Sequence, residues 1–256
     1  MPVDDSSIAP LYFLSDVHLG VGDEDAERRK LSRLLALLEQ LRGEAAALYI
    51  VGDLFDFWYE YRSVVPRGYH RLYAQLELLV SSGVTVTYLA GNHDFAIGDF
   101  FSRDLGVRVE RDHVGFTYGV RRFHVFHGDG LAVRDGGYRM LKRVLRSPLS
   151  QSLFRLLHPD LGFGIARRFS HSSRDYTATK QYGETDGMRL EAERRIREGA
   201  DIVIMGHRHV PRREELDGGV YVNLGDWIRY FTYAVFRDGD ITLHTMINGT
   251  QELYQA

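Results

Sequence analysis

Short runs of apolar residues recur along the chain, and each is followed by polar residues. The runs are rich in β-branched and aromatic side chains, a composition typical of buried β-strands. Five of these predicted strands lie at 11–14, 49–51, 84–89, 123–126 and 202–205. We expect strands rather than helices at these positions because every run is short.

Leucines at helical spacing separate the first strands. They recur at three- and four-residue intervals and predict a helix over 28–41: Leu31, Leu34, Leu35, Leu38 and Leu41. Further helices are predicted at about 69–80 and 184–199. An alternation of strand and helix is typical of repeated βαβ units, so we expect an α/β fold with a largely parallel sheet.

The spacing between apolar residues is shorter in two other regions, which indicates strands. Between 107 and 127, Gly115 and Gly119 are interpreted as turns of a hairpin that extends the sheet or begins a second one. The tail is predicted to form three antiparallel strands, at 220–224, 230–236 and 241–246.

Potential metal ligands follow all five predicted strands. They occur in this order: Asp16 and His18, Asp53 and Asp56, Asn92 with His93 and Asp94, His127, and His207 with His209. In open α/β sheets, ligands bind beyond the carboxyl ends of the strands, so residues distant in sequence meet there. One such cluster alone is typical of an ordinary turn. Five of them in a chain with eleven histidines indicate one site rather than five unrelated turns.

The chemistry of these side chains predicts a metal centre. Carboxylate oxygen and imidazole nitrogen suit borderline divalent ions such as Mn²⁺, Fe²⁺ or Zn²⁺. The chain has no cysteine, which argues against a structural zinc site. The number of candidate ligands favours a centre with two metal ions.

The composition predicts one globular domain over residues 1–256. An apolar content of 44% is sufficient for a large core at this length. Without cysteine the chain has no disulfide and no thiol nucleophile. The first ten residues lack the basic region and apolar core of a signal peptide, and no later run approaches the length that spans a bilayer. A cytoplasmic location is therefore expected.

A segment at about 131–180 differs from the rest and is predicted to be a helical cap inserted into the domain. It contains ten basic and three acidic residues, a balance of +7, whereas the remaining chain carries about −10. Leu149, Leu153 and Leu157 lie near helical spacing beside these basic residues. A basic amphipathic helix predicts an anionic partner, such as substrate phosphates, a nucleic acid or an acidic membrane surface. A solvated helix packed on its own domain fits the same pattern.

Taken together, the five clusters resemble the calcineurin-like metallophosphoesterase superfamily. The similarity lies in the order Asp-x-His, Gly-Asp-x-x-Asp, Gly-Asn-His-Asp, His-Gly-Asp and Gly-His-x-His between Asp16 and His209. The resemblance implies a four-layer α/β/β/α sandwich of two mixed sheets, with two metal ions bridged by Asp53. The other ligands that it implies are Asp16, His18 and His209 on one ion, and Asn92, His127 and His207 on the second.

The chemistry of a two-metal centre agrees with this resemblance. Two ions about 3.5–4 Å apart lower the pKa of a shared water and polarise a phosphoryl oxygen, so no protein nucleophile is needed. His93, next to the predicted ligand Asn92, is expected to be the general acid, oriented by Asp94. Asp56 is expected to cap or orient a ligand, and Arg208 to contact a substrate phosphate.

Within the superfamily, the sequence is similar to the UDP-2,3-diacylglucosamine hydrolases of lipid A synthesis. The similarity rests on Ser15–Gly20, on Gly52–Trp58 and on a helical insertion directly after His127, Gly128 and Asp129. It implies cleavage of the pyrophosphate of UDP-2,3-diacylglucosamine to UMP and 2,3-diacylglucosamine 1-phosphate, with Mn²⁺ as the usual metal. The cap would bind the acyl chains and contact the anionic inner face of the cytoplasmic membrane peripherally, and no nucleic acid partner is expected.

One position departs from this closer similarity. The better-known branch of these hydrolases has arginine after the motif asparagine, where this chain has His93. Two alternatives therefore stay open: a metal-dependent phosphodiesterase acting on another nucleotide or phosphodiester, and a non-catalytic scaffold. The residues expected to contact the lipid-linked nucleotide sugar are Asn92, His93, Arg208 and, by alignment of the cap, Asp135. The sequence makes no prediction of the oligomeric state.

Overall fold

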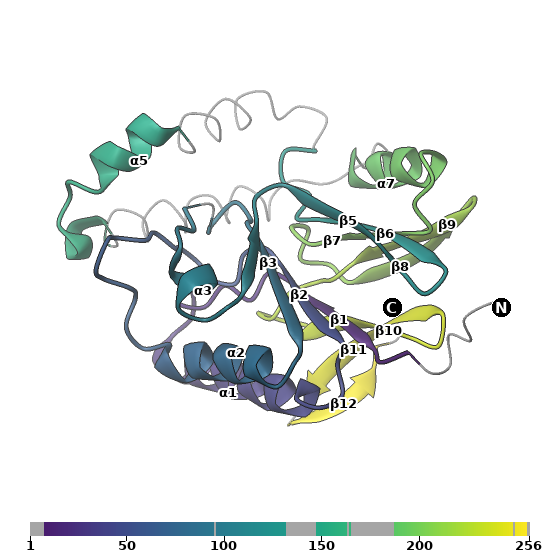
Figure 1. Cartoon of the computed structure of the whole chain (residues 1–256), viewed down its shortest axis with the longest axis horizontal. Coiled ribbons are helices and arrows are strands. Elements are labelled where there is room, and N and C mark those ends of the chain that lie inside the picture. The colour runs from purple at the N-terminus through teal and green to yellow at the C-terminus, as the bar shows by residue number, and fades with distance from the viewer. Residues whose placement is uncertain are drawn as a thin grey trace.

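The computed structural model describes residues 8–94, 96–131, 147–162, 164, 187–247 and 249–254. Most of the predicted cap, including Asp135, lies outside the described residues. Within them, two sheets pack face to face and helices lie outside the sheets (Figure 1).

The first sheet has seven strands in the order β12-β11-β10-β1-β2-β3-β4. Their bounds are Leu11–Leu14 (β1), Ala47–Val51 (β2), Thr85–Leu89 (β3), Arg108–Glu110 (β4), Thr232–Arg237 (β10), Asp240–Ile247 (β11) and Thr250–Leu253 (β12). Strands β1 to β4 are parallel to one another, whereas β10, β11 and β12 pair antiparallel. The parallel part confirms the predicted βαβ units.

The second sheet has five strands in the order β5-β6-β7-β9-β8. Their bounds are His113–Tyr118 (β5), Arg121–Phe126 (β6), Ile202–Met205 (β7), Arg212–Leu216 (β8) and Gly219–Asn223 (β9). The three central strands are parallel, and both edge strands pair antiparallel with their neighbours. Both sheets are therefore mixed.

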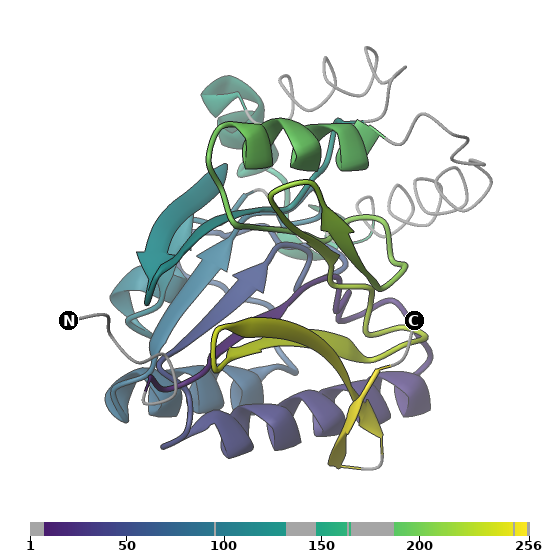
Figure 2. The same ribbon diagram turned by 90° about the vertical axis from the view of Figure 1, so that its right-hand side faces the viewer.

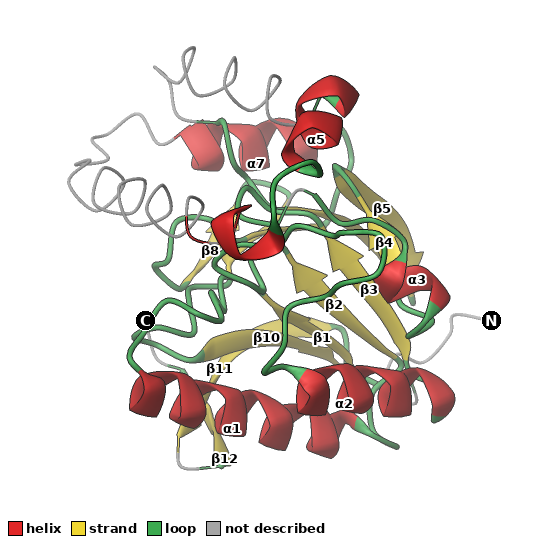
Figure 3. Cartoon of the chain, turned by 90° about the vertical axis from the view of Figure 1, so that its left-hand side faces the viewer, coloured by secondary structure: helices red, strands yellow, loops and turns green. Residues whose placement is uncertain are grey.

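Helices cover the outer face of each sheet. Helices α1 (Glu24–Leu41) and α2 (His70–Ser81) pack on the first sheet, and α7 (Gly187–Arg197) packs on the second (Figures 1 and 2). A separate apolar cluster fills the space between the two sheets. Figure 3 shows the same order of layers from the other side, with the short helices α3 (Phe100–Arg103) and α5 (Pro148–Phe154) beside them. The four-layer α/β/β/α sandwich is thus confirmed.

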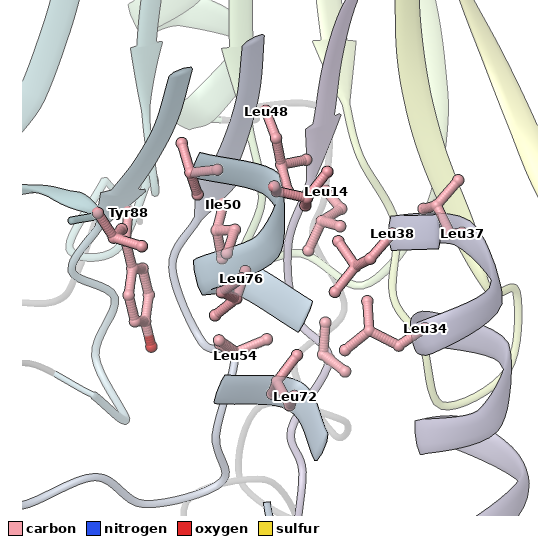
Figure 4. Packing of buried hydrophobic residues seen from close by; sticks show 14 of the residues in the cluster. Leu14, Leu34, Leu37, Leu38, Leu48, Ile50, Leu54, Leu72, Leu76 and Tyr88 are labelled. Atoms are coloured by element: carbon pink, nitrogen blue, oxygen red, sulfur yellow. The ribbon is translucent and has the colours of Figure 1, made fainter. Parts of the chain in front are cut away.

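The strands read as continuous apolar runs because both faces of the first sheet are covered. On β1, Leu11 and Phe13 belong to the cluster between the sheets, whereas Tyr12 and Leu14 belong to the cluster under the helices. The helical side of this second cluster includes leucines of α1 and α2 that pack under the first sheet (Figure 4): Leu34, Leu37 and Leu38 from α1, and Leu72 and Leu76 from α2.

The first helix begins earlier than the leucine pattern predicts. The side chain of Asp23 accepts a hydrogen bond from the N–H of Ala26 at 2.8 Å and caps the helix. The first turn carries Glu24, Asp25 and Glu27, and negative charge at this end is favoured by the helix dipole. The polar first turn contributes no leucine, so apolar spacing alone placed the start at residue 28.

Two predicted features of the second half are wrong. Gly115 is not a turn, because it pairs with His124 inside the β5–β6 ladder, whereas the turn at Gly119, with φ +58°, is confirmed. The predicted strand 220–224 corresponds to β9, which pairs parallel with β7 in the second sheet and does not join the antiparallel tail. Alternating apolar positions show that a strand has a buried face, but they do not identify its partner.

Two short strands, β8 and β12, were not predicted. Both are edge strands, and β8 consists largely of charged residues. An edge strand buries little surface, so its sequence carries a weak apolar signal.

Candidate metal centre

The carboxyl ends of five strands bring all seven predicted metal ligands together. Strands β1, β2 and β3 of the first sheet lead to Asp16 and His18, to Asp53, and to Asn92. Strands β6 and β7 of the second sheet lead to His127, and to His207 and His209. The site therefore lies where the ends of the two sheets meet.

The first group of ligands comprises Asp16, His18 and His209, whose donor atoms all lie within 4.8 Å of one another. Oδ1 of Asp16 is 3.3 Å from Nε2 of His209 and 3.7 Å from Nε2 of His18. The two imidazole rings stack with centroids 4.9 Å apart. This group can hold one metal ion.

The second group comprises Asp53, His127 and His207, together with Asn92. Oδ2 of Asp53 lies 3.3 Å from Nε2 of His127. The amide oxygen of Asn92 lies 3.0 Å from Nε2 of His127 and 2.9 Å from Nδ1 of His207. Two donor atoms that bind one ion at about 2.1 Å and at right angles are about 3 Å apart, so this spacing suits a second ion.

Asp53 connects the two groups. Its Oδ2 atom lies 3.6 Å from Nε2 of His18 in the first group and 3.3 Å from Nε2 of His127 in the second. Its carboxylate is buried, with 1% of its surface exposed. The Asp53 carboxylate therefore lies within reach of both groups.

Burial and hydrogen bonding support a metal site rather than a set of ion pairs. Among the described residues, Oδ1 of Asp16 and Nε2 of His18 are buried and have no hydrogen-bond partner. A buried polar atom without a partner is costly, and binding a cation removes that cost. The carboxylate and imidazole donors also fit a divalent ion of the Mn²⁺, Fe²⁺ and Zn²⁺ type.

The pKa values show how strongly the anionic groups act on the imidazoles. Burial by itself lowers the pKa of His127, but the charge of Asp53 and a hydrogen bond to it raise the pKa to about 10. Burial likewise lowers the pKa of His18, and the carboxylates of Asp16 and Asp56, at 3.7 and 3.5 Å from its ring nitrogens, raise it to about 9. The same electrostatic field that holds these protons would stabilise bound cations.

The backbone at the site is strained. Asp16, His18, Asp53, His207 and His209 all have positive φ, between 47° and 66°. Left-handed backbone is unfavourable for residues other than glycine, and such strain concentrates at functional sites. The fold thus holds five of the seven predicted ligands in a conformation that local preference disfavours.

Glycines in the motifs make room for the ligands. A Cβ atom on Gly52 would lie 2.5 Å from Nδ1 of His127, and one on Gly206 would lie 2.5 Å from Oδ2 of Asp16. A Cβ atom on Gly91 would overlap the Asp53 carboxylate. The glycines that precede Asp53, Asn92 and His207 are therefore required by close packing.

Neighbouring acceptors orient three of the imidazoles. Nδ1 of His127 donates to the carbonyl of Val51 at 2.9 Å, which leaves Nε2 as the metal-binding atom. Nδ1 of His18 lies 3.5 Å from Oδ1 of Asp56, whose orienting role stays a prediction. Nδ1 of His209 lies 3.3 Å from Oδ2 of Asp226.

Asp226 is a site residue that sequence reasoning missed. It is buried and follows Gly225 just after β9, so it repeats the pattern of an acidic residue after a strand and a glycine. Strand β9 was assigned to the antiparallel tail, and for that reason its end was not considered part of the site.

His93 lies at the edge of the first group. Its Nδ1 atom donates to the carbonyl oxygen of Asp56 at 2.8 Å, and its backbone N–H donates to Oδ1 of Asp53 at 2.9 Å. The ring meets His18 edge to face, with centroids 4.7 Å apart. Because Nδ1 donates to a carbonyl, Nε2 is the ring atom on which a proton for a leaving group would be held.

His18, Asp56 and His93 also have donor atoms close enough to bind an ion. Such an ion would need Nδ1 of His93 to give up its hydrogen bond to the Asp56 carbonyl. It would also need Nδ1 of His18, on the ring whose Nε2 faces the first group. We therefore interpret these three residues as a hydrogen-bonded support for the centre.

The predicted contact between Asp94 and the His93 ring is not present. Asp94 accepts hydrogen bonds from the N–H of Leu54 at 2.8 Å, from the N–H of Gly91 at 2.7 Å and from the hydroxyl of Tyr88. It lies fully buried beneath the loops. Asp94 therefore links the loop after β2 to the loop after β3, and the carbonyl of Asp56 orients His93 instead.

Of the two remaining predicted substrate contacts, Arg208 and Asp135, the structure describes only Arg208. Arg208 is half-buried between two candidate ligands, and its backbone N–H donates to the carbonyl of Gly206 at 2.8 Å. Its contact with a substrate phosphate stays a prediction. Asp135 lies outside the described residues.

The described part of the cap, residues 147–162, carries an exposed apolar surface. Leu149 and Leu156 are 71% and 81% exposed, and Leu153 and Leu161 are 57% and 62% exposed. Within the described residues, no helix combines the length and apolar character that a membrane span requires.

Phe154, the last residue of α5, packs against two aromatic rings of the domain. The ring of Phe154 lies 4.5 Å from that of Tyr59 and 6.0 Å from that of Phe57, measured between centroids. Phe57 directly follows Asp56, so α5 rests on the segment that leads away from the metal centre. The dense aromatic stretch after Asp53 thus forms a packed wall.

Comparison with known proteins agrees with this geometry. The family model described as calcineurin-like phosphoesterase matches residues 9–211. A protein of Porphyromonas gingivalis named UDP-2,3-diacylglucosamine hydrolase is 33% identical and covers 92% of this chain and 97% of its own length. A protein of Pseudomonas aeruginosa with the same name is 34% identical and covers 86% of this chain and 91% of its own length.

A third relative of that name, from Neisseria meningitidis serogroup B, is 31% identical and covers 90% of this chain and 95% of its own length. The family-model match includes every strand end that carries a candidate ligand between Asp16 and His209. The relatives named hydrolases also favour an enzyme over a non-catalytic scaffold. The chain therefore belongs to the calcineurin-like phosphoesterase family and is a metal-dependent hydrolase.

Proposed function

We propose that this protein is a dinuclear metal hydrolase that cleaves the pyrophosphate bond of UDP-2,3-diacylglucosamine. The products are UMP and 2,3-diacylglucosamine 1-phosphate. The observation that carries the dinuclear part is the position of Oδ2 of Asp53, at 3.6 Å from His18 and 3.3 Å from His127. The proposed substrate is supported by the relatives named UDP-2,3-diacylglucosamine hydrolase, which match 86% to 92% of this chain.

The ligands divide into two sets with one shared member. Asp16, His18 and His209 would hold the first ion, Asn92, His127 and His207 would hold the second, and Asp53 would be the shared ligand. Two ions bound there would lower the pKa of a shared water and polarise a phosphoryl oxygen. The donor set suits Mn²⁺, which we propose as the metal, and also Fe²⁺ or Zn²⁺.

His93 supplies the proton in this proposal. The hydrogen bond from Nδ1 to the Asp56 carbonyl prevents the ring from turning, so Nε2 keeps one orientation toward the leaving oxygen. The ring is 10% exposed, which leaves it reachable by a substrate that binds at the centre. Asn92 and Arg208 flank the same centre and are proposed to contact the phosphates, and Asp135 to contact the sugar nucleotide.

The cap is proposed to bind the acyl chains. Four leucines in its described part expose more than half of their surface, and two of them, Leu149 and Leu153, lie on α5, which rests on the segment that follows Asp56. The whole insertion also has a charge balance of +7, which favours an anionic surface. We therefore propose that the protein acts at the inner face of the cytoplasmic membrane without spanning it.

A hydrolysis panel with Mn²⁺ tests the substrate. The substrates are UDP-2,3-diacylglucosamine, a UDP-sugar without acyl chains and bis-p-nitrophenyl phosphate. We expect the diacylated substrate to have the highest kcat/KM. Equal kcat/KM for the UDP-sugar without acyl chains would reject the lipid substrate and favour a phosphodiesterase acting on another nucleotide, the alternative that His93 in place of arginine supports.

Substitutions in the cap test where the chains bind. We expect replacement of Leu149, Leu153 and Leu157 by serine to raise KM for the diacylated substrate without changing hydrolysis of bis-p-nitrophenyl phosphate. The controls are Leu78→Ser and Leu190→Ser, two leucines that are 45% and 47% exposed on helices elsewhere. If both substrates respond equally in a folded variant, the cap does not bind the chains.

Vesicle binding tests the membrane contact. Replacing Arg139, Arg143 and Arg146 with glutamine removes three positive charges from the cap. We expect weaker binding to vesicles that contain anionic lipid, and a smaller difference at high salt because exposed charges are screened within about 8 Å at physiological ionic strength. Unchanged binding would reject the membrane contact while leaving the hydrolase proposal in place.

A further inference from the structure

Asp226 lies in a turn that contacts both sides of the first metal-binding group. The turn follows β9, and Gly225 allows it with a φ of +75°. The N–H of Trp227 donates to the carbonyl of Asp16 at 3.1 Å. The side chain of Asp226 faces His209. One turn therefore supports two predicted ligands that come from different sheets.

The Asp226 carboxylate is held in one orientation. Its Oδ1 atom accepts hydrogen bonds from the N–H groups of Ile228, Arg229 and Tyr230 at 3.1, 2.8 and 3.1 Å. Only 3% of the residue is exposed. Three donors on one oxygen leave Oδ2 as the atom that faces the metal centre.

Oδ2 determines which nitrogen of His209 is able to bind a metal. It lies 3.3 Å from Nδ1 of His209, and a carboxylate oxygen accepts a hydrogen bond from N–H. Nδ1 therefore carries the proton, and the lone pair of Nε2 points toward Oδ1 of Asp16 at 3.3 Å. His209 needs this support because its own backbone has an unfavourable φ of +60°.

The second group is supported differently. Nδ1 of His127 donates to a neutral backbone carbonyl, that of Val51, at 2.9 Å. A carboxylate behind an imidazole increases its basicity as a ligand more than a carbonyl does. The first group thus has a carboxylate contact, from Asp226 to His209, where His127 of the second group has a carbonyl contact. A substitution of Asp226 removes the carboxylate contact from the first group alone.

We propose that Asp226 is a positioning residue that sets the affinity of the first metal site through His209. This inference rests on the proposed dinuclear centre and adds to it a residue that belongs to neither ligand set. Removal of such a support typically reduces metal affinity about 10- to 100-fold. The loss should fall on the first site, since the Asp226 side chain contacts His209 and the next residue of its turn, Trp227, contacts Asp16.

The main test is Asp226→Asn, studied as the metal-free full chain titrated with Mn²⁺. Asparagine keeps an oxygen for the three N–H donors but places an NH₂ group opposite Nδ1 of His209, which favours the wrong tautomer. We expect affinity at the first site to fall about 10- to 100-fold, with a less than threefold change at the second. Calorimetry and bound-metal analysis both measure this without an assay of activity.

Asp201→Asn is the matched control. Asp201 also accepts a backbone hydrogen bond, from Arg122 at 2.7 Å, but it directly precedes β7 and so lies at the opposite end of that strand from the ligands. We expect wild-type affinity at both sites in this variant. A similar loss in both variants would show that the effect is general destabilisation, and the proposal would be rejected.

A double-mutant cycle separates positioning from folding. In a His209→Ala background, the further change Asp226→Asn should alter metal affinity by less than twofold, because the proposed effect requires the His209 ring. A full additional loss would mean that Asp226 acts by another route. Unchanged affinity of the single Asp226→Asn variant would mean that Asp226 only anchors its turn.

Nitrogen NMR of the wild-type chain provides a test that needs no folded Asp226 variant. The His209 signals, assigned by their loss in His209→Ala, should show a protonated Nδ1 and an unprotonated Nε2 at pH 7.5. The opposite tautomer would overturn the inference.

Failure of the proposed function can be distinguished from failure of the inference about Asp226. Wild-type protein that binds no Mn²⁺ would reject both the dinuclear centre and the role of Asp226. Protein that binds two ions but does not cleave UDP-2,3-diacylglucosamine would reject only the substrate.

Discussion

The Oδ2 atom of Asp53 lies 3.3 Å from the Nε2 atom of His127, although the two residues come from different sheets. Asp53 follows β2 of the first sheet, and His127 follows β6 of the second. Their contact therefore depends on how the two sheets pack. The same oxygen is 3.6 Å from Nε2 of His18, so one carboxylate lies close to both groups of candidate ligands.

Asp53→Ala should remove metal and activity together. Without the shared carboxylate, each ion loses a ligand and the charge that balances it. We expect bound Mn²⁺ to fall well below two per chain by elemental analysis, with loss of turnover. Asp25→Ala, at an exposed position on α1, is the control and should keep both ions. Metal content near two per chain in Asp53→Ala would refute the bridging role.

His93→Ala should separate metal binding from catalysis. We expect both ions to be retained and turnover to fall roughly 10²- to 10⁴-fold, the usual effect of removing a general acid. The loss should be smaller for bis-p-nitrophenyl phosphate, whose leaving group needs little protonation. An equal loss for both substrates would argue against the acid role. Loss of an ion would instead assign His93 to the metal-binding group with His18 and Asp56.

Gly52→Ala and Gly43→Ala form a matched pair at the same backbone conformation. Gly52 has a φ of +81° and Gly43 a φ of +85°, but only at Gly52 would a Cβ atom meet other atoms, Nδ1 of His127 at 2.5 Å and Cα of Gly91 at 2.8 Å. We expect Gly43→Ala to lower the free energy of unfolding by about 1–2 kcal/mol, the cost of left-handed backbone.

Gly52→Ala should lose more than this and should also bind less metal, because the clash displaces His127. Urea unfolding and metal analysis measure the two effects. Equal loss of stability in the two variants, with normal metal content in both, would show that glycine is required at position 52 only because of its positive φ and not because of the contact with His127.

His124 should contribute to acid destabilisation of the fold. The residue is half-buried on β6, and burial, followed by the charges of Arg195 and His113, lowers its pKa from 6.5 to about 4. Between these two values the unfolded chain binds a proton that the folded chain does not, so stability falls as pH falls from about 6.5 through 4.

His124→Gln removes this titration. We expect the melting temperature of the variant to fall less than that of the wild type between pH 7.5 and pH 4.5, measured without metal. His158→Gln, a similar change at an exposed histidine in the cap, should behave like the wild type. Parallel curves for His124→Gln and wild type would contradict the predicted role of His124.

Much of the site follows from local sequence. Apolar runs and the polar residues after them located the ends of β1, β2, β3, β6 and β7, because a strand buried on both faces must be continuously apolar and must end where polar groups begin. The motif glycines were also visible, and the structure explains them by the atoms that a Cβ would meet at Gly52, Gly91 and Gly206.

Contacts between distant residues were not visible in the same way. Asp94 was expected beside His93, its neighbour in sequence, yet its carboxylate binds Leu54, Gly91 and Tyr88 beneath the loops. Adjacent residues commonly point in different directions, so sequence proximity does not identify a hydrogen-bond partner.

The sequence by itself determined the α/β class and the parallel βαβ part, because these depend on apolar spacing. It also indicated the seven candidate ligands, through motifs that resemble those of the metallophosphoesterases. The tertiary structure alone decided that β9 joins the second sheet, and this placed Asp226 behind His209. It also decided that Asp53 meets His127 across the sheet interface. Such relationships depend on strand partners and on the packing of two sheets, and the period of a local pattern contains no information about either.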